Sequence, residues 1–528
     1  MAAHLYGRYL VWKSAMDEAT PSFEELTARD AFFLYAEREE APLHIGAVYI
    51  FEGRPAPGGR GAQGIVETLE ERLHLVPRYR QKVRFRPFNL GHPVWVDDPD
   101  FDLEYHVRHA SLPPPGDDAA LREFAARVLA RRLDSSRPLW EMYVVEGMTG
   151  GRVALINKVH HAMVDGLSSV DIGTLLFDIE PEQQPRTPVP WEPRPSPNEL
   201  TLALSSLDGL RRLLDVNPLA LNPLRLRQRV SELVRGAAEE ALATPWAGAA
   251  SLALSLVRPG SQFFFNRLIS PHRRIHHLSI KLATLKEVKD LFAATVNDVV
   301  LAVVAEGMHR WLRERGESPQ EVMRVFCPVS VRDPSQRYAL GNLVSGMVVE
   351  LPIGEMPPVT RLARISGATS ELKRSGQAVA ATSLTAVTSW APATLHALGS
   401  RIASEPRFGL QSRVNMVVTN VPGPQVPFYT GGAQLLEVWP YVPVYHTLGL
   451  TVALVSYNGD VHFGLTADRD LVPDVDRLAR HMNRATQEFQ AIARRLRRPF
   501  TPRSRKTRVA SVAPSSPEGA QAPRTRRG

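Results

Sequence analysis

The sequence predicts a two-domain α/β fold in which a linker joins two halves. The chain of 528 residues is too long for one ordinary hydrophobic core. Hydrophobic residues make up 44% of it and charged residues 22%, a balance typical of globular proteins. Two regions of strand-like and helix-like patterns are separated by Gln184–Asn198, where six of fifteen residues are proline. The predicted boundaries are an extension over 1–25, a first half over 26–183, a linker over 184–265, a second half over 266–496 and a tail over 497–528.

The first half combines short apolar runs, which predict strands, with longer patterns of helical period. The run HIGAVYIF at His44–Phe51 is rich in β-branched and aromatic residues. A turn-like Met-Thr-Gly-Gly segment at 148–151 separates two further apolar runs. The predicted strands are His44–Phe51, Met142–Val145 and Arg152–Val159, and the predicted helices are Ile65–His74, Leu121–Leu133 and Leu167–Ile179.

The second half follows a stretch, Glu199–Val257, that has mostly helical patterning. A long apolar helix is predicted next, and further strands follow it before a final amphipathic helix leads into the polar tail. The predicted helices are Val296–Arg315 and Asp474–Leu496, and the predicted strands are Arg324–Val329, Ser345–Leu351, Ser412–Thr419, Leu450–Ser456 and Asp460–Ala467.

Charge is distributed unevenly along the chain. The net charge is +8, but Arg494–Gly528 holds eleven Lys or Arg and one acid, so this segment carries +10 and the remainder −2. A near-neutral body argues against specific nucleic-acid binding, and the tail, rich in Pro, Ser and Arg, is expected to be disordered. We expect the basic tail to bind an anionic membrane surface or a lipid droplet. A single cysteine, Cys327, and the lack of a secretory signal or a long apolar run indicate a cytoplasmic protein.

The segment Val153–Val170 carries the strongest chemical signal. It reads VALINKVHHAMVDGLSSV, so an apolar strand runs into His160 and His161, followed by Asp165-Gly166 and an amphipathic pattern. A neutral imidazole takes the proton of an alcohol as the oxygen attacks, and the thiol of a thioester leaves readily. The pattern therefore predicts acyl transfer with a histidine general base. The alternation of faces along the strand leaves open which histidine is the base.

Asp165 and Gly166 have conformational explanations. Asp165 is suited to cap the following helix or to pair with a cation, and Gly166 permits a tight turn or a close approach. Metal binding is the competing chemistry for the histidines. Consecutive strand residues point to opposite faces, and no HExxH or cysteine-rich partner accompanies them, so we expect no metal and no cofactor.

Three further residues are candidate substrate contacts. Trp140 is placed either to line an acyl channel or to pack in the core. Asn297 and Asp298 open an apolar helix, where capping explains them as well as substrate binding does. Cys327 lies in an apolar run and is expected to pack. Walker A and GxSxG motifs are missing from the sequence, which argues against nucleotide hydrolysis and serine-hydrolase chemistry.

Taken together, the motifs resemble those of the bacterial wax ester synthase/acyl-CoA:diacylglycerol acyltransferase family, one of the coenzyme A-dependent acyltransferases with an HHxxxDG signature. The match covers roughly Leu26–Leu496. In chain order the motifs are Pro42-Leu-His-Ile-Gly46, Arg137-Pro-Leu-Trp-Glu141, His160–Gly166, Asn297-Asp298, Pro328-Val-Ser-Val-Arg332 with Gly341-Asn342, and Asn420-Val-Pro-Gly-Pro424.

This resemblance implies two chloramphenicol-acetyltransferase-like halves with the site in a tunnel between them. It also implies that the second histidine, His161, is the base and that His160 and Asp165 are mainly structural. The substrates it implies are acyl-CoA and either diacylglycerol or a long-chain fatty alcohol, with direct transfer. Two alternatives stay open, namely a related enzyme with a polyketide or peptide acceptor and a non-catalytic lipid-binding protein.

Overall fold

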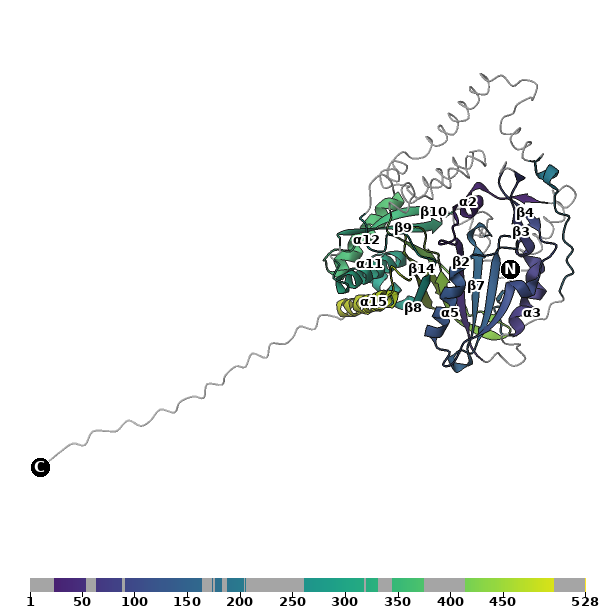
Figure 1. The fold of residues 1–528 in the computed structure, drawn as a ribbon. Coiled ribbons are helices and arrows are strands. Elements are labelled where there is room, and N and C mark those ends of the chain that lie inside the picture. Colours follow the sequence, from purple (N-terminus) through teal and green to yellow (C-terminus); the bar gives the residue numbers. More distant parts are fainter. Residues whose placement is uncertain are drawn as a thin grey trace, which may run out of the picture.

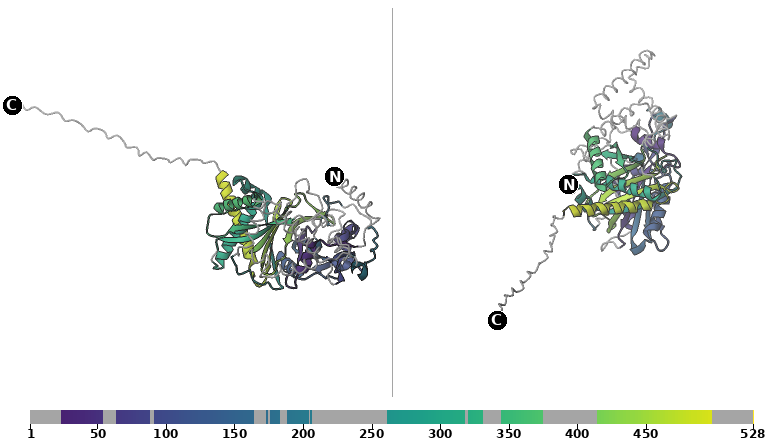
Figure 2. Two further views of the ribbon diagram at one scale, coloured as in Figure 1. Left: turned by 90° about the horizontal axis from the view of Figure 1, so that it is seen from above. Right: turned by 90° about the vertical axis from the view of Figure 1, so that its left-hand side faces the viewer.

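A computed structural model gives the fold. It describes residues 23–53, 63–87, 91–163, 173, 176–182, 188–203, 205, 261–317, 320–330, 344–374, 414–497 and 528. The predictions for the N-terminal extension, for most of the linker and for the tail therefore lie outside the described residues. Figures 1 and 2 show two bodies side by side, the first built mainly from residues before 183 and the second from residues after 261.

A six-stranded mixed sheet organises the first half, in the order β12-β13-β2-β7-β6-β5. Its centre is an antiparallel pair, β2 and β7, which run side by side over their full length. Every residue of β7 after the first is buried, because the strand is covered on both faces. The strands are β2 (His44–Phe51), β5 (Val107–Ser111), β6 (Trp140–Glu146), β7 (Val153–His160), β12 (Tyr429–Thr430) and β13 (Ala433–Tyr441).

Two strands of this sheet come from the second half of the sequence. β13 pairs antiparallel with β2, so the chain crosses from the second body to the first and back. The crossing brings β13 close to β15 of the second body. A Cβ atom on Gly464 would lie 1.7 Å from the carbonyl oxygen of Pro440, so only glycine fits at that point. The sequence prediction places residues 429–441 in the second half. In the structure their two strands belong to the sheet of the first half.

A second six-stranded mixed sheet organises the second half, in the order β10-β9-β11-β14-β15-β8. β11 lies parallel to both β9 and β14, while the other neighbours are antiparallel. The strands are β8 (Arg273–Lys281), β9 (Val322–Ser330), β10 (Val344–Pro352), β11 (Met416–Val421), β14 (Leu450–Tyr457) and β15 (Asp460–Asp468). A third, small sheet joins β1 (Glu24–Glu25), β4 (Val94–Asp97) and β3 (Gln81–Arg84).

Helices cover these sheets, and α11 is the most deeply buried of those described. Fourteen of its nineteen residues are buried, in agreement with its apolar sequence. Cys327 of β9 packs in the same core, and burial raises the pKa of its thiol to about 12. The helices are α2 (Ala28–Ala36), α3 (Gln63–Arg72), α4 (Leu103–His106), α5 (Asp118–Ala130), α10 (Leu282–Leu291), α11 (Val296–Glu314), α12 (Pro358–Arg374) and α15 (Val475–Arg497), with 3₁₀ turns at Leu73–Leu75, Pro77–Arg80, Thr149–Gly151 and His161–Met163.

The helix predicted over Leu167–Ile179 falls mostly outside the described residues. At its predicted end, Asp178 forms an isolated β-bridge with Tyr429 instead of a helical turn. Across the part of the chain that the structure describes, no single helix is long and apolar enough to cross a membrane. Helices α10 and α11 meet that test only as a pair, and they are bent by 100° to each other.

Candidate active site

Strand β7 ends at His160, and His161 begins a 3₁₀ turn. The register of the β2–β7 pair places His44 opposite His160. Immediately beyond the ladder, the backbone N–H of His161 donates to the carbonyl of Leu43 over 2.9 Å. Because β7 lies between β2 and β6 in the sheet, neighbouring strands hold the backbone that leads into His161 on both sides.

His160 is fully buried and its hydrogen bonds define its tautomer. Its Nδ1 accepts from the backbone N–H of Ala162 over 3.0 Å, so the ring proton lies on Nε2. That nitrogen faces Oε1 of Glu37 at 3.6 Å. His160 therefore connects the turn that contains His161 to a carboxylate at the end of α2.

His161 stacks on an aromatic ring. Its imidazole lies against Phe33 of α2, with ring centroids 3.8 Å apart and planes 14° apart. Nδ1 of His161 is buried and has no hydrogen-bond partner among the described residues. Burial lowers the pKa of His161 to about 4. The ring is therefore neutral near pH 7, which is the form that accepts a proton.

The Pro42–Gly46 motif packs the strand beside the histidines. His44 is fully buried, and its Nε2 donates to the carbonyl of Leu129 over 2.7 Å. A Cβ atom on Gly46 would lie 2.0 Å from the carbonyl oxygen of Asn157 on β7, so glycine permits this close pairing. Both residues therefore hold β2 against β7 and α5.

Trp140 is a core residue in the described structure. Its side chain has no exposed surface, and its Nε1 donates to the carbonyl of Tyr79 over 2.8 Å. The indole also stacks on His106, with ring centroids 4.5 Å apart. These contacts favour the packing role of Trp140 over the alternative in which it lines a channel. Contact between Trp140 and substrate stays a prediction.

Asp298 caps helix α11 and joins it to α12. Its carboxylate accepts from the backbone N–H of Thr295 over 2.9 Å, and Thr295 returns a capping bond to its N–H. The hydroxyls of Thr369 and Ser366 also donate to it, over 2.7 and 3.2 Å. Burial raises the pKa of Asp298, but these hydrogen bonds outweigh burial and lower the pKa overall. The geometry supports the capping interpretation.

The side chain of Asn297, the neighbour of Asp298, makes a different contact. Its Oδ1 accepts from Nδ2 of Asn420 at 3.4 Å, so the structure brings together two of the motifs found in the sequence. Asp165 and Gly166 lie outside the described residues, as do positions 331–343, and their predicted roles stay predictions.

Comparisons with known proteins decide the family. The sequence profile described as "Wax ester synthase/diacylglycerol acyltransferase catalytic domain" matches residues 26–300. The profile described as "WS/DGAT C-terminal domain" matches residues 340–490. The chain belongs to the wax ester synthase/diacylglycerol acyltransferase family. The expectation drawn from the ordered motifs is confirmed.

Curated relatives agree with this assignment over nearly the full length. Two proteins of Mycobacterium tuberculosis, each named "probable diacylglycerol O-acyltransferase", are 34% and 30% identical to the chain over 474 and 469 residues. These alignments cover 89% and 87% of this chain and 96% and 97% of the relatives. As a member of this acyltransferase family, the chain is an enzyme.

Solved structures confirm the two-part α/β fold. The wax ester synthase/diacylglycerol acyltransferase from Marinobacter aquaeolei VT8 superposes with a TM-score of 0.62 at 25% identity, covering 89% of this chain and all of that one. The first condensation domain of the calcium-dependent antibiotic synthetase superposes with a TM-score of 0.54 at 14% identity, covering 90% of this chain and 97% of that one. The second likeness concerns the fold alone.

Sequence reasoning missed three residues of this wax ester synthase/diacylglycerol acyltransferase site. Phe33 and Glu37 lie on and just after α2, far from the histidines in sequence. Lys158 is fully buried on β7, two residues before His160, and its Nζ lies 3.7 Å from Oε2 of Glu141. Burial lowers the pKa of Lys158 to about 8. Glu37 is one of three acids, with Glu39 and Glu40, shortly before the Pro42–Gly46 motif, and such a cluster of acids is equally typical of an exposed surface.

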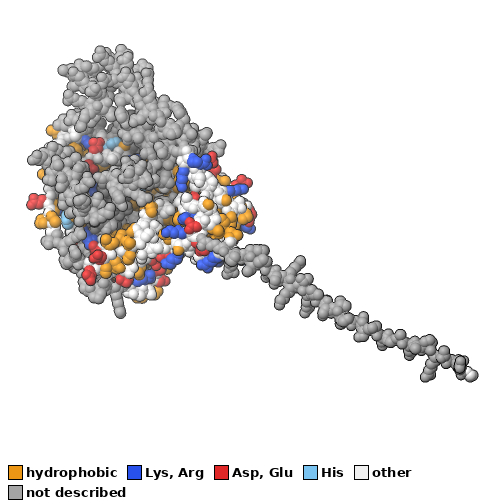
Figure 3. Space-filling view, turned by 180° about the vertical axis from the view of Figure 1, so that it is seen from behind, with side chains coloured by type: hydrophobic (Ala, Val, Ile, Leu, Met, Phe, Trp, Pro, Cys, Tyr) orange, Lys and Arg blue, Asp and Glu red, His pale blue; other side chains and the backbone are white. Residues whose placement is uncertain are grey.

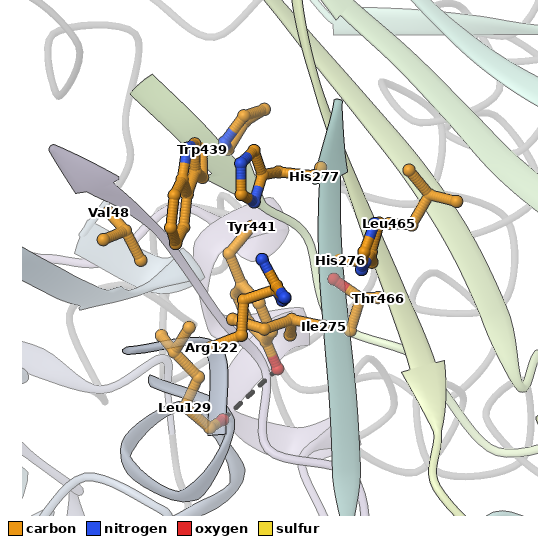
Figure 4. A pocket seen from close by; sticks show the side chains of 12 residues that line it. Val48, Arg122, Leu129, Ile275, His276, His277, Trp439, Tyr441, Leu465 and Thr466 are labelled. Carbon is orange, nitrogen blue, oxygen red and sulfur yellow. Dashed lines mark hydrogen bonds between the residues drawn. The ribbon is translucent and has the colours of Figure 1, made fainter. Parts of the chain in front are cut away.

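A small cleft lies between the two bodies, lined by residues of β2, α5, β8, β13 and β15. Figure 4 shows Trp439 of β13 stacked on His277 of β8, with ring centroids 3.7 Å apart, and the Arg122 side chain beside them. The hydroxyl of Tyr441 donates to the carbonyl of Leu129 across the floor of this cleft over 3.2 Å. Within the described residues, no group of three or more His, Cys, Asp or Glu is arranged to hold a metal ion.

Buried histidines predict acid sensitivity of the fold. Burial lowers the pKa values of His106, His161 and His276 to about 4 and that of His277 to about 3. Unfolding returns each toward about 6.5, so below that pH the unfolded chain binds protons that the folded chain excludes. Stability is therefore complete above about pH 6.5 and is lost as the pH falls toward 4. We expect Tm, measured by differential scanning fluorimetry, to fall steadily from pH 6.5 to 4.5.

The Glu37 carboxylate does not contribute to this change of Tm with pH. Burial raises the pKa of Glu37, but His160 and Arg132 lower it overall to about 2, so its contribution is lost only below the window tested. A Tm that stays constant down to pH 5 in buffers of equal ionic strength would contradict the assignment of neutral buried histidines.

Proposed function

We propose that this enzyme moves a long-chain acyl group from acyl-CoA to the hydroxyl of diacylglycerol, of a long-chain fatty alcohol or of both, with His161 as general base. The observation that carries the proposal is the His161 imidazole itself. It is neutral, it stacks on Phe33, and it stands where a rigid central strand ends. The names of the Mycobacterium tuberculosis relatives support diacylglycerol as one acceptor.

In the proposed reaction the acceptor alcohol donates its proton to His161 as its oxygen attacks the thioester carbonyl. Because Nδ1 of His161 is buried, Nε2 is the nitrogen that we assign to this transfer. The tetrahedral intermediate then expels the coenzyme A thiolate, and the imidazolium donates its proton to this thiolate. The products are an ester and free coenzyme A. Transfer is direct, and the cysteine of the chain, Cys327, is buried in the core of the second half and takes no part.

His160, Asp165 and Gly166 have supporting roles in this proposal. His160 holds the turn through the Ala162 N–H, while Asp165 and Gly166 keep the supporting roles predicted for them from the sequence. The proposal needs no metal or other cofactor, because the thioester already carries a good leaving group.

A thiol-release assay tests the acceptor. Purified enzyme is incubated with palmitoyl-CoA alone, with hexadecanol, with a diacylglycerol in detergent, and with a peptide amine, and free thiol is followed with a chromogenic disulfide. We expect release to depend on the alcohol and to match ester formed, measured by thin-layer chromatography. Release that needs a peptide amine instead of an alcohol would favour the condensation-type alternative. Acyl-CoA binding with no release under any condition would favour a non-catalytic lipid-binding protein.

We further propose that the basic C-terminal segment holds the enzyme at an anionic lipid surface. Residues Arg494–Gly528 carry +10, while the rest of the chain is near neutral. On the face shown in Figure 3, basic and acidic side chains of the described body are interspersed. Arg494 and Arg495, which begin this basic segment, are exposed at the end of α15. Both proposed acceptors are insoluble in water, so residence at such a surface brings the enzyme to them.

Truncation after Leu496 should therefore weaken binding to vesicles that contain anionic phosphatidylserine. In the full-length protein this binding should fall as salt rises, because the Debye length is only about 8 Å at physiological ionic strength. A matched variant in which the Lys and Arg residues of the tail become Gln keeps the length and should lose binding equally. Activity on a detergent-dispersed acceptor should stay nearly unchanged. Equal vesicle binding by truncated and full-length protein at low salt would contradict the tether.

A further inference from the structure

Two side chains near the end of α2 face the histidine pair. Phe33 and Glu37 are four residues apart, a spacing that places side chains on one side of a helix. Phe33 stacks on the His161 ring, and Glu37, which ends the helix as its C-cap, faces His160. Both contacts are to the reacting motif, and the two residues come from an element that precedes it by a long stretch of sequence.

The Glu37 carboxylate is almost fully buried and each of its oxygens is used. Oε1 accepts from the backbone N–H of Leu43 over 3.1 Å and lies 3.6 Å from Nε2 of His160. Oε2 accepts from two nitrogens of Arg132, over 2.7 and 3.1 Å. Because the pKa of Glu37 is held at about 2, the carboxylate keeps its charge at the pH values at which the enzyme is assayed.

These contacts enclose His161 from both directions along the chain. The N–H of His161 donates to the carbonyl of Leu43, whose own N–H is held by Glu37. The N–H of Ala162, the residue after His161, donates to Nδ1 of His160. Nε2 of His160 lies 3.6 Å from Oε1 of Glu37, beyond hydrogen-bond distance, and has no hydrogen-bond partner among the described residues. Oε1 of Glu37 is therefore hydrogen-bonded to the backbone that holds the N–H of His161, and its charge faces the histidine that holds the N–H of Ala162.

Helix α2 is in turn anchored by the second half of the molecule. The hydroxyl of Tyr445 donates to the carbonyl of Ala36 at the helix end over 3.2 Å. The buried guanidinium of Arg273 on β8 donates to the carbonyl of Glu40 in the following turn. The position of Glu37 and Phe33 therefore depends on both bodies.

We propose that α2 is the positioning element of the active site, in which Glu37 holds the backbone of Leu43 and, through it, that of His161, the Glu37 charge faces His160, and Phe33 sets the plane of the His161 ring. Neither is a catalytic residue, because each acts through a histidine. This inference rests on the proposed role of His161 as the base. Replacing a partner that orients a metal-binding histidine typically changes activity about 10- to 100-fold, and we expect an effect of this order for Glu37.

The test compares Glu37→Gln with Arg132→Gln. Glutamine keeps the size of the side chain but removes the charge that faces His160. Arg132→Gln removes the outer ion pair and leaves the carboxylate contacts to Leu43 and His160 intact. With palmitoyl-CoA and hexadecanol, we expect Glu37→Gln to lose about 10-fold or more in kcat with little change in KM. Arg132→Gln should keep kcat within about 3-fold, less than the loss expected of an orienting residue.

Phe33→Leu provides a second, independent variant that leaves the charges in place, so it answers the question if Glu37→Gln does not fold. Loss of the flat stacking face should lower kcat about 2- to 13-fold, the range of aromatic pair energies. Circular dichroism and Tm measure folding in each case. A wild-type kcat in folded Glu37→Gln or in Phe33→Leu would overturn the proposal, as would equal kcat losses in Glu37→Gln and Arg132→Gln.

The His161→Ala variant separates the two levels of inference. If His161→Ala is inactive while Glu37→Gln is fully active, the positioning role of α2 fails and the proposed base stands. If His161→Ala retains full activity, the proposed base fails first, and the positioning role fails with it.

Discussion

Replacing His161 with alanine is expected to lower the rate of acyl transfer by roughly two to four orders of magnitude. In the proposed mechanism the imidazole takes the proton from the acceptor alcohol, and alanine has no atom that can do so. The backbone N–H of residue 161, which donates to Leu43, is kept. The variant should therefore fold with a Tm close to that of the wild type, and single-turnover thiol release with hexadecanol measures the loss.

His160→Ala is the informative comparison for this prediction. It removes a fully buried side chain that accepts from Ala162 and faces Glu37, so we expect it to lower Tm as well as activity. A loss of activity without a loss of stability in His161→Ala, set against a loss of both in His160→Ala, distinguishes the base from its support. Near-wild-type activity in folded His161→Ala would remove it from the mechanism.

Local sequence patterns predict the strands that carry this site. Strand β2 begins and ends where the HIGAVYIF run predicts, and β7 is displaced by one residue from its predicted bounds. Both are apolar runs bounded by turn signals, for which periodicity and composition agree. The capping box at Thr295 and Asp298 likewise makes the start of α11 predictable.

Non-local pairing is what the sequence does not reveal. β13 reads AQLLEVWPY, with a proline and a glutamate inside it, and its partner β2 belongs to the other half. β8 reads RRIHHLSIK, a partly exposed and strongly basic strand that has no apolar run to predict it. Both strands depend on long-range contacts, which local propensity does not encode.

The same limit applies to the site. The HHxxxDG pattern predicts a histidine base because its residues lie close together in the sequence, and the family resemblance implies that this base is His161. The Glu37 carboxylate and the Phe33 ring reach the histidines only because α2 folds back over the end of β7. A single acid or phenylalanine near a helix end carries no local signal of such a role, since exposed acids and packed aromatic residues are common.

Asp298→Ala is expected to destabilise the second half by about 1–3 kcal/mol. Loss of a helix cap costs about 1 kcal/mol, and a buried donor left without an acceptor costs about 1–3 kcal/mol. The Thr295 N–H and the hydroxyls of Thr369 and Ser366 lose their shared acceptor, but of these three residues only Thr369 is buried, and it keeps the carbonyl of Ser366 as a partner. Each kcal/mol should lower Tm by roughly 2–4 °C for a unit of this size.

Asn297→Ala is the matched control at the adjacent position in the first turn of α11. Its amide meets Asn420 at 3.4 Å and takes no part in the cap, so its removal should cost less than about 1 kcal/mol. The kinetic constants then separate the two explanations of the Asn297-Asp298 motif. A cap predicts that folded Asp298→Ala keeps the KM values for palmitoyl-CoA and hexadecanol. A raised KM together with an unchanged Tm would instead assign Asp298 to substrate binding, because a residue that contacts only substrate has no reason to stabilise the empty enzyme.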